Sequence, residues 1–392
     1  MPQSTPLVTY LRDLRDGRAI GVAETSFYGP LATLLNTIGA TLKPKVHCII
    51  HPKGAGAGIP DGGFYTPDQL PRSADAVAIA AQIPSRGVLE AKGTADEVER
   101  IAAGPQVAKY LARYGQVLVT NYRDFLLVGR DGAGQPRQLE RYRLAPSESA
   151  FWSAAPEVLA AEHEERLAEY LKRVMLSNAP LADPKDVAWF LASYARDART
   201  RVEHAQLPAL DLVRAALEEA LGITFQGERG DHFFRSTLVQ TLFYGVFSAW
   251  VLWCKDHTDP AARFDWRAAA YYLHVPMIEA LFNQVAAPNR LRPLGLIEVL
   301  DWTGAALNRV DRASFFERFE EVQAVQYFYE PFLEAFDPQL RKDLGVWYTP
   351  PEIVKYQVAR VDTALREELG IADGLADERV VILDPCCGTG AY

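Results

Sequence analysis

The sequence predicts three successive regions: a mixed α/β region, an all-α region and the start of a second α/β region. In the first 145 residues, short β-type runs alternate with helical segments. From Ser147 to about Leu344 the apolar residues recur at helical spacing, with almost no strand-like alternation. Near the end of the chain, the apolar run Val380–Leu383 leads into a glycine turn. We therefore expect domains at residues 1–145, 146–344 and 345–392.

The first region is expected to contain two helices and six strands. One helix should run from about Ser26 to Ile38, with Thr25 or Ser26 as its cap and Gly39 at its end. The second should cover Pro105–Tyr114. Runs rich in β-branched and aromatic residues place the strands at Val46–His51, Asp61–Tyr65, Gly87–Lys92, Gln116–Asn121, Phe125–Gly129 and Leu139–Leu144.

The charge of the chain is unevenly distributed. The formal net charge is −9, but residues 1–130 carry 14 Lys and Arg against 11 Asp and Glu. The excess of acidic residues therefore lies in the later part of the chain. Since DNA responds to local patches of charge, the acidic total does not exclude a nucleic-acid partner for the first region.

Two features favour a cytoplasmic protein. The first residues lack a basic segment followed by an apolar core, so we expect no signal peptide. The four cysteines (Cys48, Cys254, Cys386 and Cys387) are too few for a disulfide framework and lack the spacing of a zinc site.

One segment is long and apolar enough to be compared with a membrane span. Residues Ser236–Cys254 contain no charged side chain. However, the segment includes Gln240 and Thr241 and is closely flanked by Arg235 and Lys255. We therefore expect a core helix of a protein without a membrane partner.

Three residues of the first region carry the chemistry of phosphodiester hydrolysis. Such hydrolysis uses a hard cation, usually Mg²⁺, held by one or two carboxylates. Asp61 opens one expected strand, and Glu90 lies on the next. Lys92 is two residues after Glu90, so both side chains point to one face of the strand. The ammonium can then stand beside the metal and stabilise developing negative charge.

This pattern resembles the PD-(D/E)xK restriction nucleases. The resemblance rests on Ile59-Pro60-Asp61, on Glu90-Ala91-Lys92 and on the expected αβββαβ order of elements. It implies a Mg²⁺ site at Asp61 and Glu90, with Lys92 as a catalytic residue. Gln106 and Tyr110 are similar to the QxxxY motif of some branches, although they could equally be a structural hydrogen-bonding pair. Glu24 matches the position of an additional acidic ligand in some members.

A second resemblance concerns the end of the chain. The turn Asp384-Pro385-Cys386-Cys387-Gly388-Thr389-Gly390 after an apolar run resembles motif I of adenine DNA methyltransferases. Upstream, Tyr348-Thr349-Pro350 resembles their motif X. The order of the two motifs is that of the gamma class. The resemblance implies a Rossmann-like domain in which Tyr348, Thr349, Pro350, Asp384, Pro385, Gly388 and Gly390 line the S-adenosylmethionine pocket.

Together these motifs resemble a Type IIG-like restriction–modification enzyme, related to the Type ISP enzymes. The resemblance implies double-stranded DNA as the partner and a helical connector between a nuclease and an N6-adenine methyltransferase. Self-association on DNA is left open. An alternative is an adenine methyltransferase of a phage-defence system, in which the nuclease-like domain is only a DNA-binding module. Cleavage with Mg²⁺ separates the two hypotheses.

The methyltransferase catalytic motif would lie beyond Tyr392. We therefore expect that Val380–Leu383, read as a strand buried on both faces, lacks its neighbours. The segment from about Gly345 to Tyr392 should then be poorly packed, or should bury itself by unusual pairing. On the same ground, we expect this chain alone to bind S-adenosylmethionine very weakly and not to methylate DNA.

Overall fold

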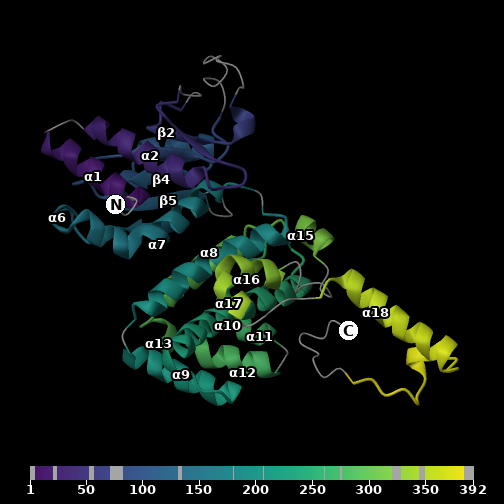
Figure 1. Ribbon diagram of the computed structural model, residues 1–392. Helices are drawn as coiled ribbons and strands as arrows, with labels where there is room; N and C mark the ends of the chain where they lie inside the picture. The colour runs from purple at the N-terminus through teal and green to yellow at the C-terminus, as the bar shows by residue number, and fades with distance from the viewer. Residues whose placement is uncertain are drawn as a thin grey trace. The chain divides into compact units, whose positions relative to one another are not determined.

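The structure is a computed structural model. It describes residues 5–20, 24–52, 57–70, 83–130, 135–179, 181–205, 207–259, 261–273, 276–319, 328–343 and 349–383, with only the backbone at a few helical positions (Figure 1). The chain forms two compact units. Residues 1–182 and 193–312 make up unit 1, and residues 183–192 and 313–392 make up unit 2.

Unit 1 contains a mixed sheet of six strands whose spatial order follows the sequence. Only the β3–β4 pair is parallel, and every other neighbouring pair is antiparallel. β3 and β4 therefore require a crossover, which α4 and α5 provide. The strands are β1 (His47–Ile50), β2 (Gly62–Tyr65), β3 (Val88–Ala91), β4 (Val117–Thr120), β5 (Asp124–Arg130) and β6 (Pro136–Arg143).

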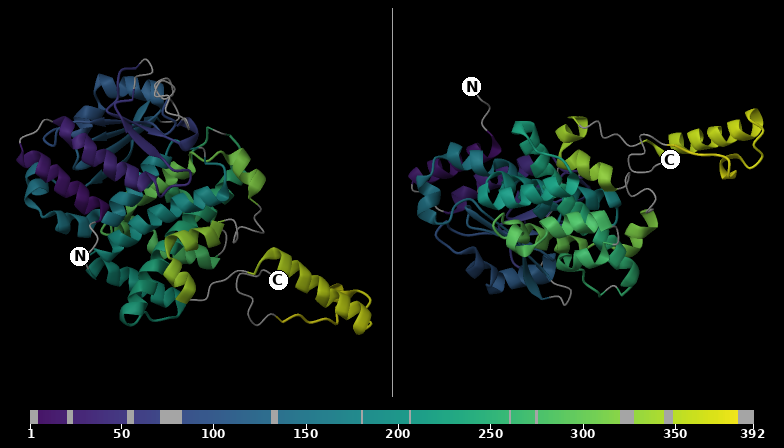
Figure 2. Two further views of the ribbon diagram at one scale, coloured as in Figure 1. Left: turned by 45° about the horizontal axis from the view of Figure 1, so that its top comes forward. Right: turned by 90° about the horizontal axis from the view of Figure 1, so that it is seen from below.

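Helices cover both faces of this sheet. One face packs against α4 (Val98–Ala102) and α5 (Pro105–Tyr114), and its core includes Val88, Val119 and Leu126. The alternate strand residues, such as Leu89, face the opposite side. On that side lie α1 (Pro6–Ala19), α2 (Tyr28–Gly39), α6 (Glu148–Ser153) and α7 (Pro156–Leu176). Figure 2 shows α1 and α2, in purple, beside the strands in two further views.

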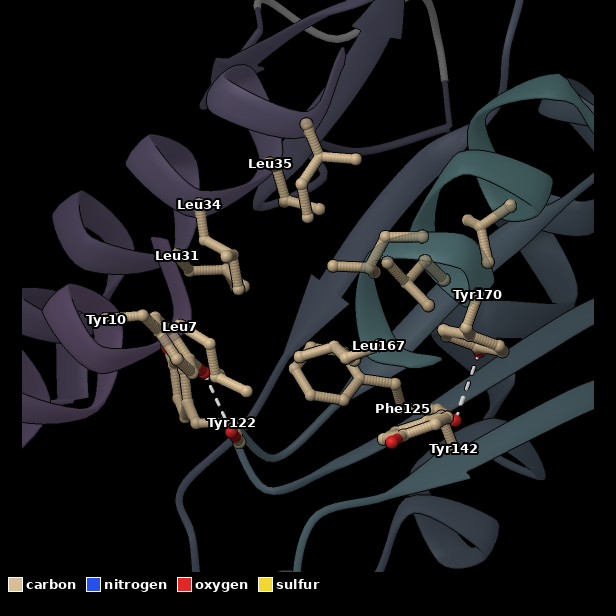
Figure 3. Packing of buried hydrophobic residues seen from close by; sticks show 14 of the residues in the cluster. Leu7, Tyr10, Leu31, Leu34, Leu35, Tyr122, Phe125, Tyr142, Leu167 and Tyr170 are labelled. Carbon is tan, nitrogen blue, oxygen red and sulfur yellow. Dashed lines mark hydrogen bonds between the residues drawn. The ribbon is translucent and has the colours of Figure 1, made fainter. Parts of the chain in front are cut away.

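Of the two cores described against the sheet, the larger joins the start of the chain to α7. Figure 3 shows leucines of α1 and α2 facing Phe125 and Tyr170 across the interior. Two buried tyrosines also tie helices to sheet backbone: Tyr10 Oη donates to Tyr122 O (2.7 Å), and Tyr170 Oη donates to Phe125 O (3.1 Å). α7 thus packs in the same core as the sheet, although the sequence assigns it to the connector.

The predicted elements of the first region are present, with ends that differ by one to a few residues. α2 is preceded by a short 3₁₀ turn, η1 (Glu24–Phe27). α1 is not among the elements predicted from the sequence. Its signals are a Thr5 side chain that caps the first turn, Pro6 at the first position, and apolar residues at helical spacing that are buried in the structure. The buried residues of α1 are Leu7, Tyr10, Leu11 and Leu14.

The remainder of unit 1 is helical, as the sequence predicts. Its longest helix, α10 (Gly227–Asp256), includes the segment Ser236–Cys254. α10 is the one described helix long and apolar enough to cross a membrane, and two thirds of its most apolar window is buried within the protein. The other helices are α8 (Pro184–Glu203), whose first residues belong to unit 2, and α9 (Leu207–Leu221), α11 (Ala269–Tyr272), α12 (Pro276–Val285), α13 (Pro288–Leu291) and α14 (Leu296–Leu307).

Unit 2 differs from its prediction at the expected strand. Val380–Leu383 forms no strand in the described part of the chain, and Val381, Ile382 and Leu383 are 91%, 69% and 84% exposed. The prediction of a strand is therefore wrong, whereas the expectation of poor packing is confirmed for these residues. The helices of this unit include α15 (Arg312–Arg318), which begins at the last residue of unit 1, α16 (Glu330–Phe336), α17 (Pro338–Asp343) and α18 (Pro351–Thr363).

Candidate functional site

Asp61 lies immediately before β2, at the end of the sheet where β3 finishes. Its Oδ2 atom accepts a hydrogen bond from the peptide nitrogen of Ala91 (2.8 Å). Its Oδ1 atom accepts a second from the Tyr28 hydroxyl (2.9 Å). The carboxylate is therefore fixed from two sides, by the backbone of β3 and by the first turn of α2.

Glu90 and Lys92 are placed by the pleat of β3. Lys92 Nζ donates to Glu90 Oε1 at 2.6 Å, and its distance from Asp61 Oδ2 is 4.0 Å. The peptide nitrogen of Lys92 donates to Thr120 O (2.9 Å), which holds the end of β3 against β4. The structure thus brings together the three residues that the sequence singles out, with the ammonium between the two carboxylates.

Gln106 and Tyr110 form the next layer of the site, on the α5 side. Gln106 Nε2 donates to Tyr110 Oη (2.9 Å) and lies 3.4 Å from Glu90 Oε2. Tyr110 Oη in turn donates to the carbonyl of Ile59 (2.8 Å). These bonds tie Glu90 to the segment that carries Asp61. The pair therefore orients the acidic residues, which is compatible with both readings that the sequence leaves open.

Burial raises the pKa of the Tyr110 hydroxyl; the bond from Gln106 lowers it, while Glu90 and Asp61 raise it. The phenol is therefore protonated near neutral pH and can keep donating to Ile59.

The solvent exposure of the side chains increases from Glu90 to Asp61 to Lys92. The side chain of Glu90 is 1% exposed, that of Asp61 14% and that of Lys92 39%. A buried carboxylate is stable only with a partner, and Lys92 is such a partner. The solvent side of the site therefore lies at the ammonium and at Asp61.

The donor set fits Mg²⁺. This ion takes oxygen ligands, binds through one or two carboxylates and keeps several waters. Asp61 and Glu90 supply two carboxylates, and the Lys92 ammonium lies beside both of them. Among the described residues, no group of three His, Cys, Asp or Glu could hold a metal ion. Glu24 begins η1, but its side chain lies outside what the structure describes.

Tyr28 is a site residue that is not predicted from the sequence. It comes from α2, and its partner Asp61 is 33 positions further along the chain. The ring of Tyr28 also packs edge-on against His51, with centroids 5.0 Å apart. Nothing in the local sequence signals this contact, because it depends on how α2 is laid across the sheet.

The proposed cofactor residues are described only in part. Pro350 caps α18, and its carbonyl accepts bonds from Ile353 N (2.9 Å) and Val354 N (3.1 Å). Thr349, which precedes it, is half-buried. The remaining residues of the predicted pocket lie outside the described part of the chain: Tyr348, Asp384, Pro385, Gly388 and Gly390.

Comparison with known protein families gives a match at the end of the chain. Residues 321–392 match the model of the N-6 DNA Methylase family. No curated protein and no solved structure matches the chain. The C-terminal region is therefore an N6 DNA methyltransferase region, and its family implies S-adenosylmethionine as cofactor and DNA as substrate. The match begins upstream of the boundary at residue 345 that the motifs predict.

Proposed function

We propose that this protein is a bifunctional restriction–modification enzyme of the Type IIG-like kind. A Mg²⁺-dependent DNA endonuclease of the PD-(D/E)xK type would reside in the six-stranded sheet and its covering helices, which we call the sheet domain. The N6-adenine methyltransferase region lies on the same chain. The observation that carries the proposal is the placement of Lys92 between Glu90 and Asp61, at hydrogen-bond distance from the first and 4.0 Å from the second. The site is cytoplasmic in this proposal, and its substrate is double-stranded DNA.

The roles of the residues follow from their contacts. Asp61 and Glu90 would hold Mg²⁺, which supplies Lewis-acid activation of water and of the phosphate. Lys92 places a positive charge at the exposed side of the site, where it can orient the attacking water and stabilise the charge that develops on the phosphate oxygens. Gln106 and Tyr110 hold Glu90 in its orientation. Tyr28 and the Ala91 peptide do the same for Asp61.

In the methyltransferase region, we propose that motif X and motif I contact S-adenosylmethionine. The residues are Tyr348, Thr349 and Pro350 in motif X and Asp384, Pro385, Gly388 and Gly390 in motif I. The support is the family match, which covers both motifs.

Cleavage of unmethylated plasmid DNA tests the nuclease proposal. We expect the whole protein to cut in Mg²⁺ and not in EDTA. Glu90→Gln and Lys92→Met should each lose at least about 100-fold in rate, since each removes an electrostatic contribution to the transition state. Lys45→Met is the matched control, because Lys45 is exposed and lies outside the site. Its rate should be unchanged.

Two results would contradict the proposal. Cleavage that persists in both variants would show that another site is responsible. DNA binding by the parent protein without any Mg²⁺-dependent cleavage would favour the alternative, in which the sheet domain is a DNA-binding module of an adenine methyltransferase used in phage defence.

A further inference from the structure

An open hollow lies beside the proposed nuclease site. It is lined by two short segments, the end of a loop and the exposed face of α5. Lys109 and Arg113 are four residues apart on that helix, so they stand one turn apart on the same face. We call this feature the Lys109 hollow. Its lining residues are Ala57, Gly58, Lys109, Ala112 and Arg113.

The chemistry of the Lys109 hollow suits an anion. Both of its charged lining residues are basic, and none of the described residues that line it is acidic. Its other lining residues are glycine and alanine, whose small side chains leave the backbone open to close approach. The two side chains Lys109 and Arg113 are exposed to solvent. Lysine and arginine side chains beside accessible backbone are the groups that contact phosphate oxygens of nucleic acids.

Gly58, which lines the Lys109 hollow, lies next to Tyr110 of the candidate site. Gly58 has a φ of +102°, a conformation that favours glycine, and a Cβ there would lie 3.7 Å from Tyr110 Oη. Tyr110 connects through Gln106 to Glu90. Ile59, which follows Gly58, accepts the Tyr110 hydroxyl and is itself two residues from Asp61. A ligand in the hollow therefore borders the residues that orient both carboxylates.

We infer that the Lys109 hollow binds a backbone phosphate of double-stranded DNA, adjacent to the phosphodiester that the site hydrolyses. The claim that this phosphate lies next to the cleaved bond rests on the proposed function. The claim that the hollow binds a phosphate is independent of cleavage, since it requires only that the protein binds duplex DNA. Contacts of this kind carry no sequence information; they set the position and orientation of the duplex.

Duplex binding as a function of salt tests this inference. The whole protein and its Lys109→Gln/Arg113→Gln variant are titrated onto a fluorescent 30-base-pair duplex in EDTA, at several KCl concentrations. Each lost phosphate contact reduces the slope of log K against log salt by roughly 0.9. We expect a slope smaller by about 2 and an affinity on the order of tenfold lower at low salt. Arg100→Gln is the matched control, because Arg100 is an exposed arginine of α4 that does not line the hollow. It should keep the slope and affinity of the parent.

The outcomes separate this inference from the proposed function. A double variant that keeps the slope and affinity of the parent overturns the inference, and so does a parent that binds no duplex. Suppose that the parent protein cleaves DNA and that the double variant binds the duplex with the same affinity and salt slope as the parent. This result would refute the phosphate site and leave the nuclease proposal intact. If instead the parent never cleaves DNA, but the double variant has a smaller salt slope than the parent, the nuclease proposal is refuted and the phosphate site is supported.

Discussion

Two segments that the sequence predicts as strands, Val88–Ala91 and Val380–Leu383, have opposite structures. Val88–Ala91 becomes β3, a central strand whose residues are at most 1% exposed. Val380–Leu383 has the β-branched character that predicts a strand, yet it pairs with no described strand and is largely exposed. The difference lies in the neighbours: β3 has β2 on one side and β4 on the other. An apolar run supplies the tendency to form a strand, and adjacent strands and covering helices supply its stability.

The same contrast holds for charged residues. Arg173 of α7 is 1% exposed; its Nε donates to Glu140 of β6 (3.0 Å), and its Nη1 donates to Ser193 of α8 (3.0 Å). In unit 2, Arg366 pairs with Asp362 at 2.7 Å, but both side chains are substantially exposed. A buried charge that loses its partner costs far more free energy than an exposed one, which water can solvate.

The largest effect is therefore expected at Arg173. Arg173→Met leaves the buried Glu140 carboxylate with the hydrogen bond from the Tyr194 hydroxyl but without the Arg173 charge, and should reduce the free energy of unfolding by about 3–5 kcal/mol. Arg366→Met should leave the unfolding midpoint unchanged within error. Urea unfolding followed by circular dichroism measures both. If Arg173→Met/Glu140→Gln is no more stable than Arg173→Met alone, the cost does not come from the orphaned carboxylate.

The second effect compares the two predicted strands, Val88–Ala91 and Val380–Leu383, directly. Leu89→Ala removes a fully buried side chain from β3 and should cost about 3 kcal/mol, through lost burial and the cavity that remains. Leu383→Ala truncates a leucine that is 84% exposed, and should change the free energy of unfolding by less than about 0.5 kcal/mol. The same unfolding experiment applies. Equal losses for the two variants would show that Leu383 is packed in solution.

The third effect concerns acid stability of unit 1. Burial alone would raise the pKa of Glu169, but Arg196 and Lys172 overcome it and lower the value from 4.5 to about 2. Because the folded pKa is depressed, the stabilisation is present above the unfolded pKa of 4.5 and is lost as the pH falls toward 2. After allowance for solvent screening, it amounts to on the order of 2–3 kcal/mol.

Urea unfolding measured between pH 6 and pH 2 tests this expectation. The parent should lose more stability over this range than Glu169→Gln, which has no proton to gain at that position. Parallel pH profiles would contradict the assignment. The pKa of Asp377 in unit 2 is also lowered to about 2, first by its hydrogen bond with Arg379. Arg379 is 75% exposed although the Asp377 side chain is only 12% exposed, so added salt should weaken this pair more than the group around Glu169.

The smallest effect belongs to Tyr28. Tyr28→Phe removes only the hydroxyl that donates to Asp61, and should reduce the free energy of unfolding by about 1 kcal/mol. If the hydroxyl positions Asp61, the concentration of Mg²⁺ needed for half-maximal cleavage should rise, with little change in the rate at saturating metal. A lower saturated rate with unchanged metal dependence would assign Tyr28 a different role.

How much the sequence predicts depends on whether the determining contacts are local. α5 and the strands of the sheet follow from periodicity, turn residues and caps, and the structure contains them. The placement of Glu90 beside Lys92 follows from the two-residue repeat of a strand. The hydrogen bond from Tyr28 to Asp61 does not follow from any local pattern, because it joins positions 33 residues apart. The same holds for Arg173 and Glu140, which are also 33 residues apart. The exposed state of Val380–Leu383 depends on neighbours that local sequence does not specify.

Divalent-metal binding tests the central claim, that Asp61 and Glu90 form a cation site beside Lys92. Mn²⁺ is titrated into the whole protein and followed by electron paramagnetic resonance, with competition by Mg²⁺. We predict saturable binding that Mg²⁺ displaces, and that is lost in Asp61→Asn/Glu90→Gln while Asp13→Asn, on exposed α1 surface, retains it. Equal Mn²⁺ binding by the parent and the Asp61→Asn/Glu90→Gln variant would contradict the claim.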